Sequence, residues 1–367
     1  MTIYFILIGY ILFSPLIIRS FVRDRDTLKK KVLLFSLIGI FLVLALKAPS
    51  VGRDTLGYRI MYERLSQASW DNFYNYYWTE TGYEVVEMLF SHFLRVDYQV
   101  FSASVYAFII LSYYKFLDRY ADDITLSLII YVCFGYIVFD ISGLRFALSL
   151  AIFLFALPYA QKRELKNALV YFVIVLIAAQ VHRGAYICLF LYFVIRFPFK
   201  GWAIVAYVSF PVIMFLFKPI LNAYLATFSN AQIESGLSIG GNVIFYCFVL
   251  LLIISLNKLW KNSVKNSASR PKKDNIFEYK NIGTQTRLFY IGTVMVATLG
   301  EGTVVRTAQY GLFTLIPLLP NAISMLNGKS RLLMKCGLFL FLISYFIIFK
   351  ILPNDLDIGP YVFFWNY

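Results

Sequence analysis

The sequence predicts an all-α, polytopic membrane protein, and three observations support this fold class. Of the 367 residues, 60% are hydrophobic and 15% are charged, whereas charged residues make up about 25% of soluble proteins. Apolar runs recur from one end of the chain to the other. The lysines and arginines gather in short segments between these runs, as they do in membrane proteins. We therefore expect one integral membrane domain over residues 1–367.

The apolar runs predict about twelve transmembrane helices, because each run approaches the length of roughly 20 residues with which an apolar helix crosses a bilayer. No soluble domain interrupts the series. The expected spans are residues 2–18, 32–47, 100–117, 124–140, 143–160, 167–181, 184–199, 201–217, 242–258, 287–300, 304–325 and 332–350.

Two long polar segments separate the runs, an outer loop at about 48–99 and a basic loop at 258–287. Cytoplasmic loops carry an excess of Lys and Arg, so we expect 258–287 to be cytoplasmic, together with the basic cluster at 19–31. Both termini then lie outside, provided that residues 84–96 do not cross the membrane. That segment contains two glutamates, a histidine and an arginine, and we expect it to form an interfacial or re-entrant helix.

Composition and motifs exclude several classes of function. The net charge of +14 is confined mostly to loops between spans, so it predicts membrane topology and no nucleic-acid partner. The four cysteines are scattered through apolar runs, and two histidines are too few for a histidine-based metal centre. No phosphate-binding glycine loop or nucleotide-binding motif is present. We expect no metal and no cofactor, and a donor substrate that arrives in the membrane.

Several arginines lie on the expected outer face, although basic residues in membrane proteins usually favour the cytoplasmic side. These arginines include Arg53, Arg59, Arg64, Arg145, Arg183 and Arg306. The planar guanidinium suits bidentate binding of phosphate. The alternative for any single arginine is that it reaches lipid headgroups or pairs with a carboxylate. For the set we favour a shared anionic ligand.

Candidate acids and bases share that face. Asp54 and Glu80 bracket the outer loop, and His182 ends an apolar run just before Arg183. Histidine titrates near neutral pH, so His182 is a candidate acid or base; its alternative role is a helix-terminal ring that bonds backbone. Asp140 and Arg145 flank a tight turn, where a simple ion-paired hairpin is the alternative to a ligand site.

Aromatic residues crowd the outer loop, among them Tyr58, Trp70 and Trp78. Trp and Tyr concentrate at membrane interfaces, so we expect most of these rings to form an interfacial belt. A minority could stack on sugar rings.

An ordered set of short motifs resembles the EpsG-like family of Wzy-type O-antigen and exopolysaccharide polymerases. The motifs are Gly52-x-Asp54-Thr55-x-x-Tyr58, Glu80-x-Gly82-Tyr83, Gly143-Leu144-Arg145-x-x-Leu148-x-x-Ala151, His182-x-x-Ala185, and Arg306 with Tyr310. Each motif alone is weak, and their order and common membrane face make the resemblance specific. The chain departs from the family at Phe146, where Gln is frequent, and at Gly184, where Ser or Thr is frequent.

The resemblance implies a metal-independent glycosyltransferase with a fold of the GT-C type in the bacterial inner membrane and a site facing the periplasm. It would move a growing glycan from undecaprenyl pyrophosphate to the non-reducing end of a lipid-linked repeat unit. Besides these lipid-linked oligosaccharides and membrane lipid, a chain-length regulator is a partner expected from the family. Candidate bases are Asp54, Glu80 and His182. Candidate substrate and pyrophosphate ligands are Arg53, Tyr58, Arg59, Arg145, Arg183, Arg306 and Tyr310, with Arg145 the first choice.

Two other functions fit parts of the pattern. An O-antigen ligase shares the lipid-linked donor, but its large late loop is periplasmic, whereas 258–287 is basic and expected in the cytoplasm. A flippase for lipid-linked oligosaccharides predicts polar residues deep in the helices and internal repeats. The charges here lie mainly at span ends, so the polymerase ranks first.

Overall fold

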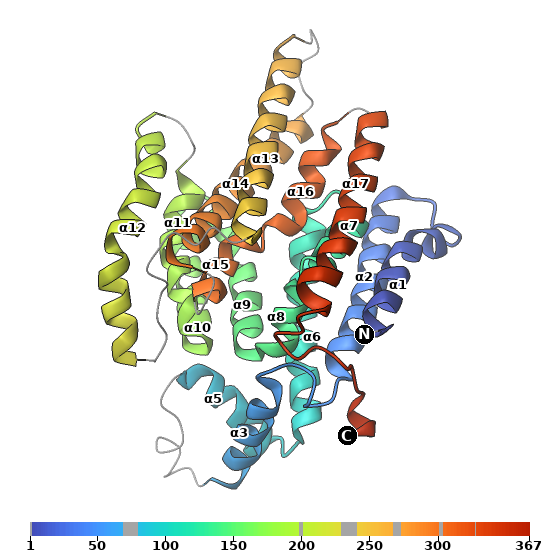
Figure 1. Cartoon of the computed structure of the whole chain (residues 1–367), viewed down its shortest axis with the longest axis vertical. Helices are drawn as coiled ribbons and strands as arrows, with labels where there is room; N and C mark the ends of the chain where they lie inside the picture. Colours follow the sequence, from blue (N-terminus) through green and yellow to red (C-terminus); the bar gives the residue numbers. More distant parts are fainter. Residues whose placement is uncertain are drawn as a thin grey trace. The chain divides into compact units, whose positions relative to one another are not determined.

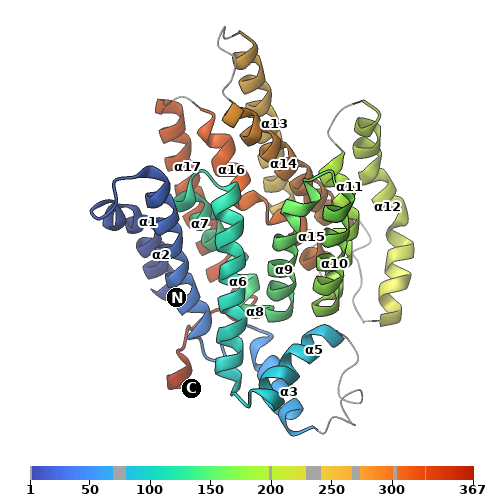
Figure 2. The same ribbon diagram turned by 180° about the vertical axis from the view of Figure 1, so that it is seen from behind.

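The computed structural model of the chain describes residues 2–68, 80–197, 201–228, 241–266, 273–300, 304–326 and 328–367, and its regular structure is helical (Figures 1 and 2). Within those ranges the extended pairing is one isolated bridge between Lys47 and Phe363. The predicted all-α class is confirmed. The chain divides into two compact units, each described here by itself: Met1–Pro158 with Leu169–Ala185 and Leu332–Tyr367, and Tyr159–Ala168 with Tyr186–Arg331.

Many of the helices coincide with the expected apolar runs, but the runs 124–140 and 304–325 are each divided between two helices, and the helix expected from residue 287 begins at Lys273. From the N-terminus to Val181 the helices are α1 (Thr2–Arg19), α2 (Arg25–Ala45), α3 (Thr55–Gln67), α5 (Thr81–Met88), the π-helix η2 (Leu89–Phe93), α6 (Tyr98–Tyr120), α7 (Ile124–Cys133), α8 (Tyr136–Ser142), α9 (Leu144–Ala160) and α10 (Leu165–Val181). Then come η3 (Arg183–Tyr186), α11 (Ile187–Arg196), α12 (Ala203–Phe228), α13 (Gly241–Asn266), α14 (Lys273–Leu299), α15 (Val304–Leu312), α16 (Leu315–Ser324), α17 (Gly328–Phe346), η4 (Ile347–Ile351) and η5 (Phe364–Asn366).

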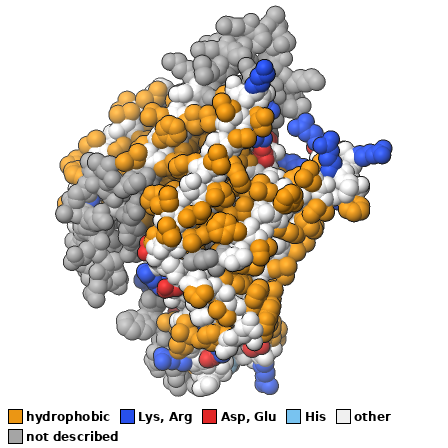
Figure 3. Space-filling view, turned by 45° about the vertical axis from the view of Figure 1, so that its right-hand side comes forward, with side chains coloured by type: hydrophobic (Ala, Val, Ile, Leu, Met, Phe, Trp, Pro, Cys, Tyr) orange, Lys and Arg blue, Asp and Glu red, His pale blue; other side chains and the backbone are white. Residues whose placement is uncertain are grey.

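Among the described residues, four helices are long and apolar enough to span a bilayer. They are Thr2–Arg19, Tyr98–Tyr120, Ala203–Ile220 and Gly328–Ile351, and α7 with α8 makes a fifth if this pair, bent by 56°, counts as one span. Large apolar side chains face outward from these helices, such as Leu16 (65% exposed) and Leu333 (76% exposed). Hydrophobic side chains likewise dominate the face drawn in Figure 3. A soluble protein would not expose so much apolar surface, so these helices face lipid.

Small and hydroxyl-bearing residues join the helices of the first unit. The Ser36 hydroxyl on α2 donates to the Ser14 hydroxyl on α1 over 2.9 Å, and the Tyr10 hydroxyl donates to the Phe35 carbonyl over 2.8 Å. Gly39 leaves the room that the Tyr10 ring occupies, because a Cβ there would lie 2.5 Å from the ring. Close approach at small residues and interhelical hydrogen bonds hold helices together in lipid, where the hydrophobic effect supplies little attraction.

The C-terminal segment folds back onto the outer loop within the first unit. The N–H groups of Gly52 and Arg53 donate to the carbonyls of Asp357 and Leu356, over 2.8 and 3.0 Å. The Tyr4 hydroxyl near the start of α1 donates to the Ile358 carbonyl over 3.0 Å. Both chain ends therefore lie beside the loop that precedes α3.

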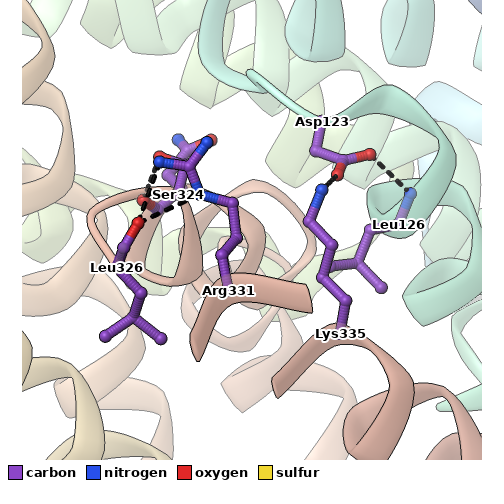
Figure 4. Close-up of polar contacts among 7 residues, drawn as sticks. Asp123, Leu126, Ser324, Leu326, Arg331 and Lys335 are labelled. Atoms are coloured by element: carbon purple, nitrogen blue, oxygen red, sulfur yellow. Dashed lines mark hydrogen bonds and ion pairs between the residues drawn. The ribbon is translucent and has the colours of Figure 1, made fainter. Parts of the chain in front are cut away.

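The other end of the first unit carries basic residues. The Lys29 ammonium donates to the Asp118 carbonyl at the end of α6 over 3.2 Å. The Lys335 ammonium pairs with the Asp123 carboxylate, which also caps α7 by accepting from the Leu126 N–H over 3.1 Å (Figure 4). Within this unit, Lys29 and Lys335 lie at the opposite end of the helices from Tyr4 and the C-terminal segment.

The expected basic loop 258–287 is largely helical. It is occupied by the end of α13 and the start of α14, while residues 267–272 lie outside the described ranges. Arg287, expected at the start of a span, is buried in the second unit and donates to the carbonyls of Val194 and Ile195 at the end of α11, over 2.9 and 2.8 Å. These last-turn carbonyls have no partner within their own helix, and a cation satisfies them.

Candidate functional site

The site is centred on Glu80, which stands just before α5. Gly82 in the first turn of α5 lies against the end of α10, where a Cβ would come within 2.6 Å of the Gln180 Cβ and 2.9 Å of the Gln180 carbonyl oxygen. Only a glycine permits this approach. It brings Glu80 next to the residues that follow α10, although Glu80 and His182 are 102 positions apart in the chain.

Glu80 joins three segments through one carboxylate. Its Oε1 lies 2.8 Å from His182 Nδ1 and accepts the Arg183 backbone N–H over 3.0 Å. Its Oε2 lies 3.1 Å from a guanidinium nitrogen of Arg145 at the start of α9. Glu80 is only 8% exposed, and a buried carboxylate needs such partners to offset the loss of hydration.

The charge state of Glu80 follows from these contacts. Burial raises its pKa, but the hydrogen bond and charge of His182, the charge of Arg145 and the Arg183 N–H together outweigh burial and hold the pKa below the usual value of 4.5. Glu80 is therefore a carboxylate at neutral pH.

The guanidinium of Arg145 lies over the aromatic ring of Tyr58. Its guanidinium carbon lies 5.3 Å from the centroid of the buried Tyr58 ring, and the Tyr58 ring packs 6.0 Å from that of Tyr83 on α5. Cations over aromatic faces are attracted by the ring quadrupole. The ion pair with Glu80 and the ring of Tyr58 together hold the guanidinium in place.

The loop before α3 is tied to the turn that presents Arg145. Gly52 has a φ of +99°, in the left-handed region, and a Cβ there would lie 2.7 Å from the Ile141 carbonyl oxygen at the end of α8. The Thr55 hydroxyl lies 3.1 Å from the same oxygen and accepts the buried Lys47 ammonium over 2.8 Å. The Gly52 and Thr55 positions of the first motif thus join this loop to α8.

The paired Asp140–Arg145 turn weighed from the sequence is not the observed arrangement. The Asp140 carboxylate accepts the hydroxyls of Tyr113 and Tyr131, over 2.7 and 2.6 Å, within the helical core. Arg145 pairs with Glu80. The alternative role of His182 as a ring that bonds only backbone is also wrong, because its Nδ1 binds the Glu80 carboxylate.

The structure brings some of the predicted residues together. Glu80, Arg145, His182 and Tyr58 form one cluster, and Arg183 joins it through its N–H while its side chain is exposed.

Other predicted residues lie apart from this contact set. Asp54 precedes α3 without capping it through its side chain. The exposed Arg53 lies 3.9 Å from the Asp357 carboxylate, and Arg59 pairs with Glu63 over 2.7 Å.

Arg306 and Tyr310 lie in α15 of the second unit, where Tyr310 is buried. Their part in a common site stays a prediction. Trp70 and Trp78 lie outside the described residues.

Phe146 explains one departure from the family pattern. Its ring packs edge-on against His182, with centroids 5.9 Å apart and planes at 85°. The chain therefore places an apolar ring beside His182 where the family frequently has the amide side chain of Gln. Tyr83, which belongs to the second motif, and Glu84 were given no role in the site by the sequence argument, and both are buried on α5. The spacing of Glu80, Glu84 and Glu87 on one helix face was the available signal.

The cluster is suited to an anion rather than a cation. Among the described residues there is no group of three or more His, Cys, Asp or Glu that could hold a metal ion. Arg145 supplies a guanidinium, and the His182 ring and the Arg183 N–H lie at the same carboxylate. Guanidinium groups are well suited to binding phosphate.

The sequence profile described as the EpsG family matches residues 30–367. A search of curated proteins found no match to the chain. A search of solved structures also found none.

Proposed function

Because the chain belongs to the EpsG family, we propose that it is a polysaccharide polymerase that transfers a growing glycan from undecaprenyl pyrophosphate to the non-reducing end of a lipid-linked repeat unit. The family indicates a membrane protein of the polysaccharide-polymerase type. The observation that carries the finer proposal is the contact of Glu80 with Arg145, His182 and the Arg183 N–H.

The proposed reaction needs no metal, because arginines can take its place. The acceptor oxygen forms a bond to the anomeric carbon, the bond from that carbon to the pyrophosphate breaks, and the pyrophosphate leaves with the electron pair. Fixed positive groups where this charge develops lower the barrier. Arg145, held by Glu80 and Tyr58, is the leading pyrophosphate ligand, and the exposed Arg183 side chain is the second.

The remaining candidates extend the same proposal. Arg53 and Arg59 stand near the C-terminal segment, where Arg59 lies over the Tyr367 ring with 5.8 Å to its centroid. We propose that they guide the anionic donor toward Arg145. Arg306 and Tyr310 on α15 remain proposed substrate ligands.

We propose about twelve spans arranged as in GT-C enzymes in the bacterial inner membrane, with the Glu80 cluster at the periplasmic face. Two features support this orientation: the termini lie beside the Gly52 loop, and the basic residues at Lys29 and Lys335 lie at the opposite end of the first unit. Basic residues favour the cytoplasmic side.

The test is a gene deletion complemented with wild type, Arg145→Ala, Arg145→Lys or Arg64→Ala. Arg64 is an exposed arginine of α3 outside the cluster and serves as the matched control. Surface polysaccharide is resolved as a ladder, and lipid-linked intermediates are extracted in parallel. The polymerase proposal predicts that the deletion and Arg145→Ala leave single repeat units, that Arg145→Lys recovers short chains, and that Arg64→Ala restores the full ladder.

Other outcomes would overturn the proposal. Long polymer retained on undecaprenyl pyrophosphate would identify a ligase. Single units retained on the lipid at the cytoplasmic face would identify a flippase. A full ladder in Arg145→Ala would remove Arg145 from the mechanism.

A further inference from the structure

A second carboxyl group lies one helical turn beyond Glu80. Glu84 is on the same face of α5, is 5% exposed, and its Oε1 has no hydrogen-bond partner among the described residues. Burying a carboxyl oxygen without a hydrogen-bond partner is costly in free energy, because the hydration of that oxygen is lost and not replaced. Such an arrangement is unusual in a structural role, and it is frequent where a group is poised to react.

The surroundings of Glu84 connect it with the Glu80 cluster. The charges of Arg145 and Arg183 act on its carboxyl group, as does the charge of Glu80. Burial raises the pKa of Glu84 and outweighs the Glu80 backbone N–H and the charge of Arg145, which lower it. Glu80, just before α5, and Glu84, in its first turn, are therefore two neighbouring carboxyl groups whose surroundings shift their pKa values in opposite directions.

Glu80 is poorly suited to accept a proton. Both of its oxygens are engaged, Oε1 by His182 and the Arg183 N–H and Oε2 by Arg145. Protonating it would break contacts that hold the arginine. A proton acceptor works best with an oxygen that no other donor occupies and with a raised pKa. Glu84 Oε1 has no hydrogen-bond partner among the described residues, and burial raises the pKa of its carboxyl group.

We propose that Glu84 is the proton acceptor for the attacking sugar hydroxyl, while Glu80 positions Arg145 and His182. This inference rests on the proposed polymerase function. As the acceptor oxygen bonds to the anomeric carbon and the pyrophosphate departs with the electron pair, the hydroxyl proton moves to Glu84 Oε1. The proton then passes to water after the product leaves. The ligand class assigned to Glu84 is thus the acceptor end of the lipid-linked repeat unit.

The test uses the full chain in proteoliposomes with undecaprenyl-pyrophosphate-linked repeat units extracted from the deletion strain. Wild type is compared with Glu84→Gln, Glu84→Asp and Glu87→Gln. Glu87 is the matched control, a fully buried glutamate three residues further along the same helix. Polymer formation is measured against pH, and binding of undecaprenyl pyrophosphate is measured separately.

Removal of a general base typically lowers the rate by about 10²–10⁴-fold. We expect Glu84→Gln to lose this much rate while it still binds the donor. In this variant the rate should no longer decrease as the pH is lowered, so the acid limb of the pH profile should be absent. Glu84→Asp should retain this acid limb at a shifted position, and Glu87→Gln should resemble wild type.

Several results would overturn the inference. A Glu84→Gln rate within about threefold of wild type, in protein that binds donor, would exclude Glu84 as the acceptor while leaving the polymerase proposal intact. An equal loss in Glu87→Gln would assign the effect to neutralising any buried glutamate of α5. If Glu84→Gln does not fold, an unshifted acid limb in Glu84→Asp would exclude the role. Wild-type protein that forms no polymer would overturn both proposals.

Discussion

Replacing Gly82 with alanine tests whether the close approach of α5 to α10 builds the site. The new Cβ would lie 2.6 Å from the Gln180 Cβ and 2.8 Å from its carbonyl carbon. Normal carbon contacts lie at about 3.5–4.0 Å, so α5 must move away by about 0.9 Å. The obstructing atoms include backbone, which cannot rotate aside.

The expected cost has a structural and a functional part. Overpacking of this kind destabilises a protein by about 1–3 kcal/mol. The same movement would lengthen the contact of 2.8 Å between His182 Nδ1 and Glu80 Oε1 to about 3.7 Å, beyond the range of a hydrogen bond. Gly82→Ala should therefore melt at a lower temperature in detergent and leave short or single repeat units in the polysaccharide ladder.

Gly57→Ala is the matched control, because Gly57 lies within α3 and a Cβ there meets nothing within 4 Å. Alanine is favoured over glycine in a helix by about 1 kcal/mol, so this variant should be at least as stable as wild type and make a full ladder. Wild-type melting and a full ladder in Gly82→Ala would refute the argument that this approach positions Glu80.

Three further predictions concern the supports of the site. Gly52→Ala, with φ at +99° and a Cβ 2.7 Å from the Ile141 carbonyl oxygen, should lose about 1–3 kcal/mol of stability, and an unchanged melting temperature would contradict this. The lowered pKa of Glu80 means that its carboxylate stabilises the fold fully above pH 4.5, and that this stability is lost as the pH falls through the pKa of the folded state. Glu80→Gln should therefore melt at a lower temperature than wild type near neutral pH, and its melting temperature should fall less on acidification. Melting temperatures of the two proteins that fall in parallel with pH would count against this. Tyr131→Phe removes one hydroxyl from the Asp140 carboxylate and should cost about 1.5–3 kcal/mol by thermal unfolding, whereas a neutral effect would mean that this hydrogen bond is dispensable.

The sequence predicted the all-α class and many of the helix positions, because the length of an apolar run can be read from consecutive residues without knowledge of the tertiary structure. The run at 2–18 became α1, which adds only Arg19, and the run at 100–117 became α6, which extends to Tyr98 and Tyr120. The bend between α7 and α8 was missed inside the single run 124–140, because apolar composition is the same on both sides of Gly135, whose φ is +93°.

Local chemistry also predicted which residue types belong to the site, but their pairing was decided by packing. The sequence argument selected Arg145 because it is a basic residue on the face where basic residues are disfavoured, and it selected Glu80 and His182 as candidate bases on the same expected face. It gave no reason to pair Arg145 with any carboxylate other than its near neighbour Asp140. Asp140 faces tyrosines of α6 and α7 instead, and the ion pair with Glu80 exists because Gly82 lets α5 meet α10. Contacts between residues 65 or 102 positions apart depend on how helices pack, which no local pattern encodes.

The sequence by itself thus determined the all-helical class and the presence of membrane-spanning helices, because hydropathy can be read from each run of residues alone. Only the tertiary structure decided which carboxylate holds the arginine and that Glu84 Oε1, one turn further on, is buried without a hydrogen-bond partner among the described residues. Glu80 and Glu84 differ by a single helical turn, and their surroundings differ because Glu80 alone reaches the N–H of Arg183 and the ring of His182.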